Sequence, residues 1–131
     1  MTDPITTEKQ KPFDPYIWRK YRHRQIQSYE KIRESVLGQI GDALTALSHQ
    51  YRWEEVYVFG SVIKPGRFQS RSDVDIAIKG LDKFQLYSFI SDISSMLQRD
   101  VDVIVLEECH FSEFIIKRGL KWNPEKISLY S

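Results

Sequence analysis

The spacing of hydrophobic residues along the chain changes between a helical and a strand-like period. Apolar residues recur every three or four positions over 29–47 and over 86–97, as on the buried face of a helix. Short runs of β-branched and aromatic residues predict three strands, at residues 55–59, 73–79 and 101–106. The order of these elements predicts an α/β (α+β) domain with a long N-terminal helix and a small mixed sheet of three to four strands. Helices flank this sheet and cover it on one side.

Local signals place the ends of the later elements. Asp82, followed three residues later by Gln85, predicts the start of the helix that buries the apolar face of 86–97. A short helix is expected at about 111–118, where Gly119 ends it. Residues 120–122 and 127–130 either pair as a hairpin or contribute only one strand.

The first helix is too long for the domain that carries it. A helix from 16 to 49 would span about 50 Å at 1.5 Å per residue, whereas a domain of this size is roughly twice a ~14 Å radius of gyration across. The helix therefore either breaks near Gly38 and Gly41 or projects as an arm. We expect a mobile, proline-containing leader at 1–15, a helical arm at 16–37 and the main domain at 38–131.

Composition excludes several classes of protein. The net charge is +1, so no overall field favours nucleic acid or a membrane surface. One cysteine, Cys109, excludes an internal disulfide framework and a cysteine-based zinc site. We see neither a signal peptide nor an apolar run long enough to cross a bilayer, and we expect a cytoplasmic protein.

The predicted arm is basic and aromatic. Its first turns contain Tyr16, Trp18, Arg19, Lys20, Tyr21, Arg22, His23 and Arg24. Such a run is most often a solvated helix whose aromatic rings pack on the body or on a second copy, which would allow self-association. The alternative is a surface that binds a partner protein or nucleic acid.

The strongest chemical signal lies between residues 58 and 78. Gly60-Ser61 follows a strand, and Asp73 and Asp75 lie two residues apart on the next, so their side chains share one face. Two neighbouring carboxylates repel each other unless a cation such as Mg²⁺ lies between them. The glycine lets backbone approach a phosphate, towards which a following helical turn would direct N–H groups. The stretch therefore indicates a site for a metal-bound nucleoside triphosphate.

Asp102 completes this set. It interrupts an apolar strand, where a charge needs a partner or a metal. If that strand lies beside 73–79, three carboxylates could bind two Mg²⁺ ions, one for the triphosphate and one for the attacking hydroxyl. Asp100 is the competing residue, but Asp102 has apolar neighbours and is preferred. An isolated Asp-x-Asp is common in turns, whereas the ordered set is far more specific.

These motifs resemble the DNA polymerase β-like nucleotidyltransferase superfamily. The resemblance rests on Phe59-Gly60-Ser61, on Asp73-Val74-Asp75-Ile76 eleven residues later, and on Val101-Asp102-Val103. It covers about residues 43–122, and the short chain is similar to the minimal nucleotidyltransferase branch. It implies the polymerase β-like fold. It also implies transfer of AMP from ATP to a tyrosine of a HEPN-domain ribonuclease toxin, by a protein acting as antitoxin.

The resemblance also implies roles for individual residues. Gly60 and Ser61 would hold the β- and γ-phosphates. Asp73 and Asp75 would bind both metals, and Asp102 would complete the second metal site and favour deprotonation of the acceptor.

The segment between the two motifs departs from the family pattern. Ser72 occupies a position that is commonly serine, where it would orient the loop. Residues 62–67 are bulkier than in relatives, and Lys64 or Arg67 would replace the usual arginine on the phosphates.

Two other functions stay open. The protein could neutralise a toxin by binding alone, using the arm. It could also transfer a nucleotide to an RNA 3′ end or to a small molecule, although the near-neutral charge and the lack of a second substrate domain count against this. RNA binding would weaken steeply with salt.

Overall fold

The computed structural model describes residues 14–123. Most of the predicted leader and the second segment of the predicted hairpin, 127–130, lie outside this range. The predicted boundary at residue 15 is one residue late, because Pro15 is the first residue of helix α2 (Pro15–Leu47). The Asp14 side chain accepts a hydrogen bond from the backbone N–H of Tyr16 at 2.9 Å, which caps the helix.

Within residues 14–123, four strands form one mixed sheet. They are β1 (Glu55–Phe59), β2 (Val74–Lys79), β3 (Val101–Val105) and β4 (Leu120–Lys121). Their order in the sheet is β3-β2-β1-β4. β1 is antiparallel to β2 and to β4, and β2 is parallel to β3. The predicted α+β fold with a long N-terminal helix is therefore confirmed.

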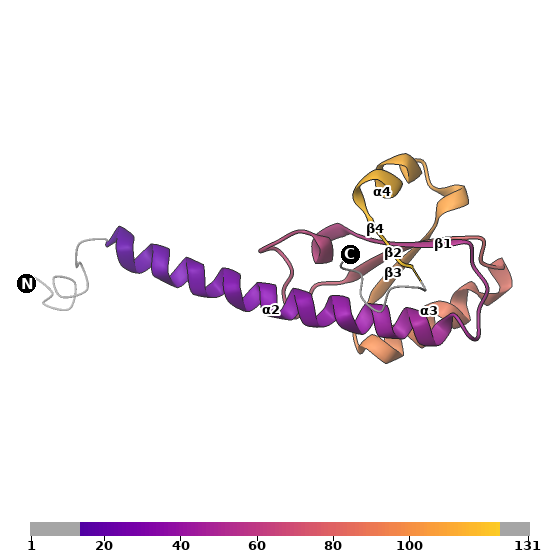
Figure 1. Ribbon diagram of the computed structural model, residues 1–131, viewed down its shortest axis with the longest axis horizontal. Coiled ribbons are helices and arrows are strands. Elements are labelled where there is room, and N and C mark those ends of the chain that lie inside the picture. The colour runs from indigo at the N-terminus through magenta and orange to yellow at the C-terminus, as the bar shows by residue number, and fades with distance from the viewer. Residues whose placement is uncertain (1–13, 124–131) are drawn as a thin grey trace, which may run out of the picture.

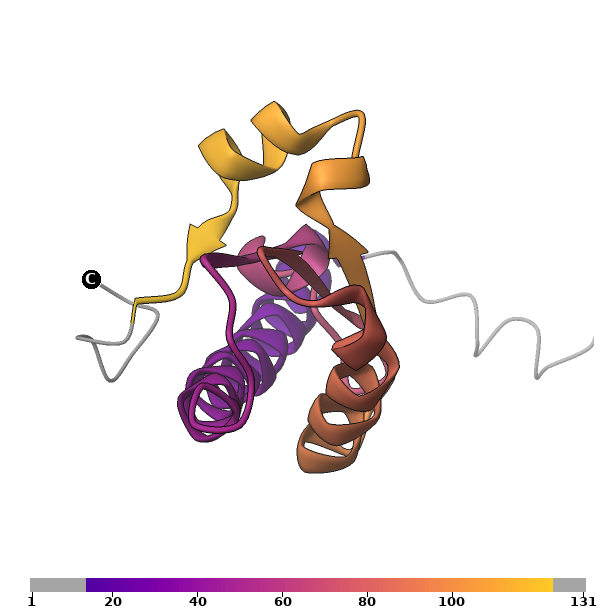
Figure 2. The ribbon, with the colours of Figure 1, turned by 90° about the vertical axis from the view of Figure 1, so that its right-hand side faces the viewer.

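Helices cover both faces of this sheet, and the prediction of a sheet covered on one side is wrong. α2 and α3 (Leu86–Leu97) lie side by side on one face, and α4 (Ser112–Arg118) lies on the other (Figure 2). The first face buries the larger core, which includes Leu37, Ile40, Leu44, Val56, Val58, Ile76, Ile78, Phe89 and Ile93. On the second face Ile115 and Leu106 pack against Tyr57 and Ala77. The short helix therefore buries apolar surface of its own.

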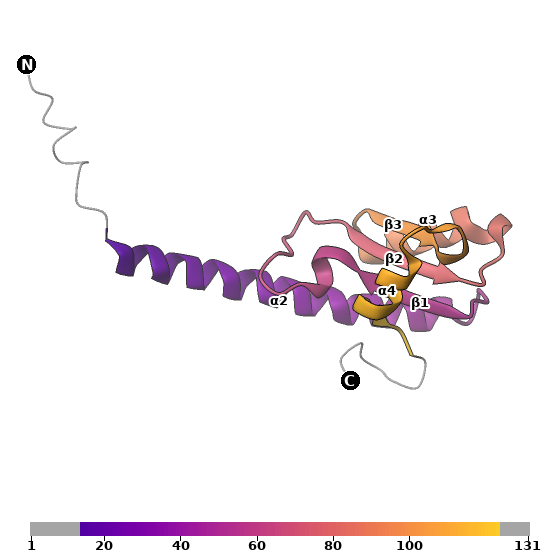
Figure 3. The same cartoon turned by 90° about the horizontal axis from the view of Figure 1, so that it is seen from above.

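The long helix does not break, and its first half projects as an arm (Figures 1 and 3). Its 33 residues span about 50 Å. Its buried residues begin only at Val36. Gly38 is exposed, and a Cβ placed there would meet nothing within 4 Å. This glycine therefore marks neither close packing nor a break.

Several predicted boundaries shift by a residue. β2 begins at Val74, so Asp73 precedes the strand, and β3 ends at Val105, so Leu106 opens a short 3-10 helix, η3 (Leu106–Glu108). α4 begins at Ser112 with Phe111 as its N-cap. Ahead of α3, the Asp82 carboxylate accepts the Phe84 N–H at 3.0 Å.

One residue of the predicted apolar face of α3 points outwards. Phe89, Ile93 and Leu97 are buried at spacings of four, whereas Met96 is 48 % exposed on the flank of that face. In residues 14–123, no helix is both long enough and apolar enough to cross a bilayer.

Candidate active site

The sheet register brings two of the predicted carboxylates together. Asp75 of β2 is the direct partner of Phe59 on β1 and of Asp102 on β3. Residues in register on neighbouring strands present their side chains on the same face. Ala77, two residues further along β2, packs beneath α4, so Asp75 and Asp102 also lie on the α4 face. The predicted pairing of the second and third strands is confirmed.

Asp75 lies among negative charges. It is partly buried, and this burial raises the pKa of its carboxyl group. The carboxylates of Asp102 and Asp73 raise the same pKa further, in that order. Asp73 and Asp102 are both exposed. The three groups thus share one region in which negative charge is unfavourable without a counter-ion.

This donor set fits a divalent cation. Within the described range 14–123, no three His, Cys, Asp or Glu side chains converge closely enough to form a ready-made metal site. The available ligands are nevertheless carboxylate oxygens, which suit Mg²⁺. Rotation of the exposed Asp73 and Asp102 side chains towards an ion costs no packing. Asp73, Asp75 and Asp102 are therefore the residues that could hold such a metal.

Gly60 is required at its position for two reasons. Its φ of +82° lies in the left-handed region, which disfavours other residues. A Cβ at this position would also overlap the carboxylate of Asp75. Gly60 opens a short 3-10 helix, η1 (Gly60–Ile63), and Ser61 follows, partly exposed. The carboxylate thus lies directly against the backbone of the predicted phosphate-binding motif.

Two side chains of α2 form hydrogen bonds with η1 and with the loop that follows it. The Glu30 carboxylate accepts the backbone N–H of Gly66 and forms an ion pair with Arg33, with 2.8 Å between Arg33 Nη2 and Glu30 Oε2. Arg33 Nη1 also donates to the carbonyl of Val62 at 3.4 Å. The bonds from Arg33 and then from Gly66 hold the pKa of Glu30 below its usual value. Sequence reasoning missed this pair, whose only local signal is its i, i+3 spacing.

A second anchor holds the loop next to Asp73. The guanidinium of Arg99 lies over the buried ring of Phe68, 4.9 Å from its centroid, and donates to the Ser72 carbonyl at 2.7 Å. Burial lowers the pKa of Arg99, and the charge of Asp73 partly offsets this. Ser72 Oγ accepts the Gln69 N–H at 2.9 Å, a bond within the turn that precedes Asp73. Sequence reasoning missed Phe68 and Arg99.

A cavity of about 460 Å³ adjoins Gly60. Its walls come from β1, η1 and α4, and are formed by Phe59, Gly60, Ile63, Lys64, Phe111, Phe114, Ile115 and Arg118. Lys64, one of the two predicted phosphate-binding cations, lines this cavity, whereas Arg67 is not part of its lining. Sequence reasoning missed Phe111, Phe114 and Arg118, although their spacing places them on one side of a helix.

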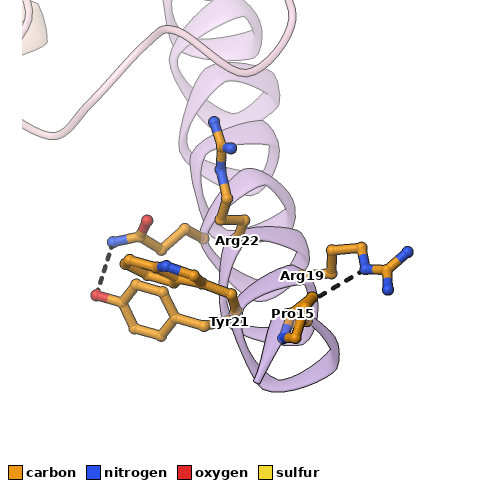
Figure 4. A pocket seen from close by; sticks show the side chains of 6 residues that line it. Pro15, Arg19, Tyr21 and Arg22 are labelled. Carbon is orange, nitrogen blue, oxygen red and sulfur yellow. Dashed lines mark hydrogen bonds between the residues drawn. The ribbon is translucent and has the colours of Figure 1, made fainter. Parts of the chain in front are cut away.

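A second hollow, of about 590 Å³, lies at the far end of α2 and shares no residue with the carboxylate site. It is lined by Pro15, Trp18, Arg19, Tyr21, Arg22 and Gln25 (Figure 4). The rings of Trp18 and Tyr21 lie 5.7 Å apart, and Gln25 Nε2 donates to the Tyr21 hydroxyl at 3.0 Å. All of its lining residues belong to the first turns of α2, which project from the body as the arm (Figure 1).

Comparison with known families agrees with this geometry. The family model described as "Polymerase beta, Nucleotidyltransferase" matches residues 43–121, more than half of the chain. The matched range includes Gly60, the three carboxylates and α4, and it excludes the arm. Neither a curated protein nor a solved structure matched the chain.

Proposed function

Because the chain belongs to the polymerase beta nucleotidyltransferase family and so carries a nucleotidyltransferase domain, we propose that it is a protein adenylyltransferase. It transfers AMP from ATP to a protein hydroxyl, the tyrosine of a HEPN ribonuclease toxin, and so acts as an antitoxin. The observation that supports this proposal best is the shared register of Asp75 and Asp102 beside Gly60. The HEPN partner follows from the resemblance to the minimal branch of the family.

In this reaction the acceptor hydroxyl oxygen attacks the α-phosphorus of ATP. A new phosphorus–oxygen ester bond forms, the bond to the bridging oxygen of the β-phosphate breaks, and pyrophosphate leaves with the electron pair. Asp102 accepts the proton of the hydroxyl. Gly60 and Ser61 bind the β- and γ-phosphates, with Lys64 as the nearby cation.

The carboxylates of Asp73, Asp75 and Asp102 would hold two Mg²⁺ ions. Bound Mg²⁺ neutralises phosphate charge and lowers the pKa of the attacking hydroxyl. Asp75 is positioned for this by its register with Asp102, and the loop bonds of Ser72 and Arg99 position Asp73.

The test uses ATP labelled at the α-phosphate, Mg²⁺ and a HEPN-domain ribonuclease as the candidate partner. The wild type should label that partner, and the double variant Asp73→Ala, Asp75→Ala should not. An unlabelled partner with the wild type, or equal labelling by the double variant, contradicts the proposal.

A second candidate function is neutralisation by binding alone, which the surface of the arm favours. Tyr16, Ile17, Trp18, Tyr21 and Ile26 are each about half to two-thirds exposed, and they lie on a helix that projects from the body. Among them, the rings of Trp18 and Tyr21 lie 5.7 Å apart, and contiguous exposed apolar surface is typical of a protein interface. The variant Trp18→Ser, Tyr21→Ser discriminates between the functions. If it abolishes toxin neutralisation while the Asp73→Ala, Asp75→Ala variant still neutralises, binding is the function.

A further inference from the structure

The cavity between η1 and α4 has the chemistry of a nucleotide site. We propose that it holds the base and ribose of the nucleotide, with the ring of Phe114 as the surface on which the base stacks. This inference rests on the proposed function and adds to it the residues that recognise the nucleoside. Its volume of about 460 Å³ is within the range of small-molecule sites.

Two aromatic rings of this cavity are not used by the core. Phe111 is 50 % and Phe114 58 % exposed, while Ile115 beside them is fully buried. The buried isoleucine anchors α4 to the sheet, and the two phenylalanines stay available for a ligand. Aromatic rings that line a cavity in this way are suitable for stacking with a base.

The charges of the lining favour an anion. The guanidinium of Arg118 lies 5.4 Å from the centroid of Phe114, and Lys64 lies on the η1 side. The lining, as far as residues 14–123 form it, includes no acidic side chain. Flat apolar surface beside two cations is complementary to a nucleotide, which combines a planar base with phosphate charge.

The cavity also has the required position relative to the carboxylates. Gly60 lines the cavity and also lies against Asp75, so one glycine separates the two regions. A nucleotide with its base on Phe114 would therefore carry its triphosphate across Gly60 towards Asp75.

Gly119 lies where the end of α4 packs against β1. A Cβ at Gly119 would lie 2.7 Å from the Ile115 carbonyl, too close for a real contact, and 3.2 Å from the Val58 carbonyl, a tight contact. A larger residue at this position would therefore have to move away from the last turn of α4 and would press on the strand. The stacking residue is thus carried on a helix packed tightly against the sheet.

The test is calorimetric binding of ATP and of inorganic tripolyphosphate, each with Mg²⁺, to the full chain. Phe114→Ala should weaken ATP binding about 5- to 150-fold, which corresponds to roughly 1 to 3 kcal/mol per stacked base. Binding of tripolyphosphate, which has no base to stack, should not change.

Phe84→Ala is the matched control. Phe84 is 83 % exposed and has the Nζ atom of Lys83 5.5 Å from its ring centroid, so it repeats the same pair of groups outside the cavity. This variant should bind both ligands as the wild type does. Phe114→Tyr should bind ATP normally and Phe114→Leu weakly, since only tyrosine keeps the flat ring.

Arg118→Gln provides an independent variant. It should weaken ATP binding at least fivefold, while Lys117→Gln, on the neighbouring exposed position outside the lining, should have no effect. The inference is overturned if Phe114→Ala leaves ATP binding unchanged, if it weakens tripolyphosphate equally, or if the wild type does not bind ATP.

Two outcomes separate this inference from the proposed function. ATP binding that depends on Phe114, without labelling of any partner, supports the nucleoside site and contradicts the transfer reaction. Labelling that requires Asp73 and Asp75 but has the same KM for ATP in Phe114→Ala supports the transfer and overturns the nucleoside site.

Discussion

At the scale of single residues, Asp75 is a carboxylate whose ionised form is disfavoured by its surroundings. It is partly buried, pairs in register with Asp102 and lies against Gly60. Burial and the neighbouring carboxylates raise its pKa above the ordinary value of 3.8. The ionised form is therefore less favourable in the fold than in the unfolded chain, and its destabilising effect grows as the pH rises through the raised pKa.

Asp75→Asn should consequently separate stability from activity. In EDTA at pH 7 the melting temperature should equal or exceed that of the wild type, because asparagine has the same size and no charge. At pH 3, where Asp75 is protonated, the two proteins should melt alike. Mg²⁺ should raise the melting temperature of the wild type more than that of the variant, and transfer should fall about 100-fold or more. A variant less stable than the wild type at pH 7 in EDTA would contradict the electrostatic argument.

Asp102 and Asp100 form a matched pair of carboxylates. Both are exposed at the start of β3, but only Asp102 is in register with Asp75. The Asp100 carbonyl accepts the N–H of Val74 at 3.1 Å, a backbone bond that a side-chain change leaves intact. Asp102→Asn should lower the transfer rate about 100-fold or more, and Asp100→Asn should leave it unchanged. Steady-state labelling rates test this pair, and equal losses would contradict the role given to Asp102.

At the scale of elements, the inner half of α2 supports the loop that carries the site. Glu30 and Arg33 contact Gly66 and Val62 more than twenty-five residues away in sequence. These bonds join the helix to the loop between β1 and β2. The helix thus contributes to the geometry of the site without supplying a ligand to it.

Glu30→Gln should destabilise the protein by about 1 kcal/mol at pH 7, since it removes a charge-assisted bond and an ion pair. Because the pKa of Glu30 is lowered in the fold, its stabilising effect is present above the ordinary value of 4.5. It is lost as the pH falls below that value, through the lowered pKa. Denaturant unfolding should therefore show a smaller difference between variant and wild type at pH 3 than at pH 7.

Glu34→Gln, an exposed change one turn further along α2, should change stability by less than about 0.5 kcal/mol at either pH. A difference between Glu30→Gln and wild type that stays constant with pH would show that the carboxylate charge is not involved.

The unbroken helix leads to a further prediction at Gly38. This glycine is helical and exposed, and a Cβ added to it would meet no heavy atom within 4 Å. Gly38→Ala should stabilise the protein by about 0.5–1 kcal/mol because alanine loses less backbone entropy in a helix. Gly60→Ala should instead destabilise it, since it combines a positive φ with overlap onto Asp75. Chemical denaturation measures both changes.

At the scale of the whole molecule, the body and the arm are physically distinct. The body packs α2 and α3 on one face of the sheet and α4 on the other, and it carries every residue of the candidate active site (Figure 2). No residue of the arm before Val36 is fully buried, and its outer turns, which project from the body (Figure 1), carry exposed aromatic and basic side chains. The candidate catalytic residues and the exposed aromatic surface thus lie on separate parts of one chain.

The sequence alone determined the family and, to within a residue at each end, the strands β1, β2 and β3, and it pointed to the three carboxylates. β1 was predicted with its observed bounds, because Val56, Tyr57, Val58 and Phe59 favour a strand locally. Asp102 was singled out because a charge among apolar strand residues needs a partner, and β3 does lie beside β2. These features depend on short-range propensity and on motif spacing, which the sequence states directly.

Only the tertiary structure decided how distant segments meet. Gly38 and Gly41 were compatible with either a broken or a projecting helix. In the structure α2 is continuous and its buried residues begin only at Val36, so its first half projects. The Glu30–Gly66 bond and the cavity between η1 and α4 join residues that no periodicity connects. Such contacts depend on how the helices pack on both faces of the sheet, and packing is a non-local property that local spacing does not contain.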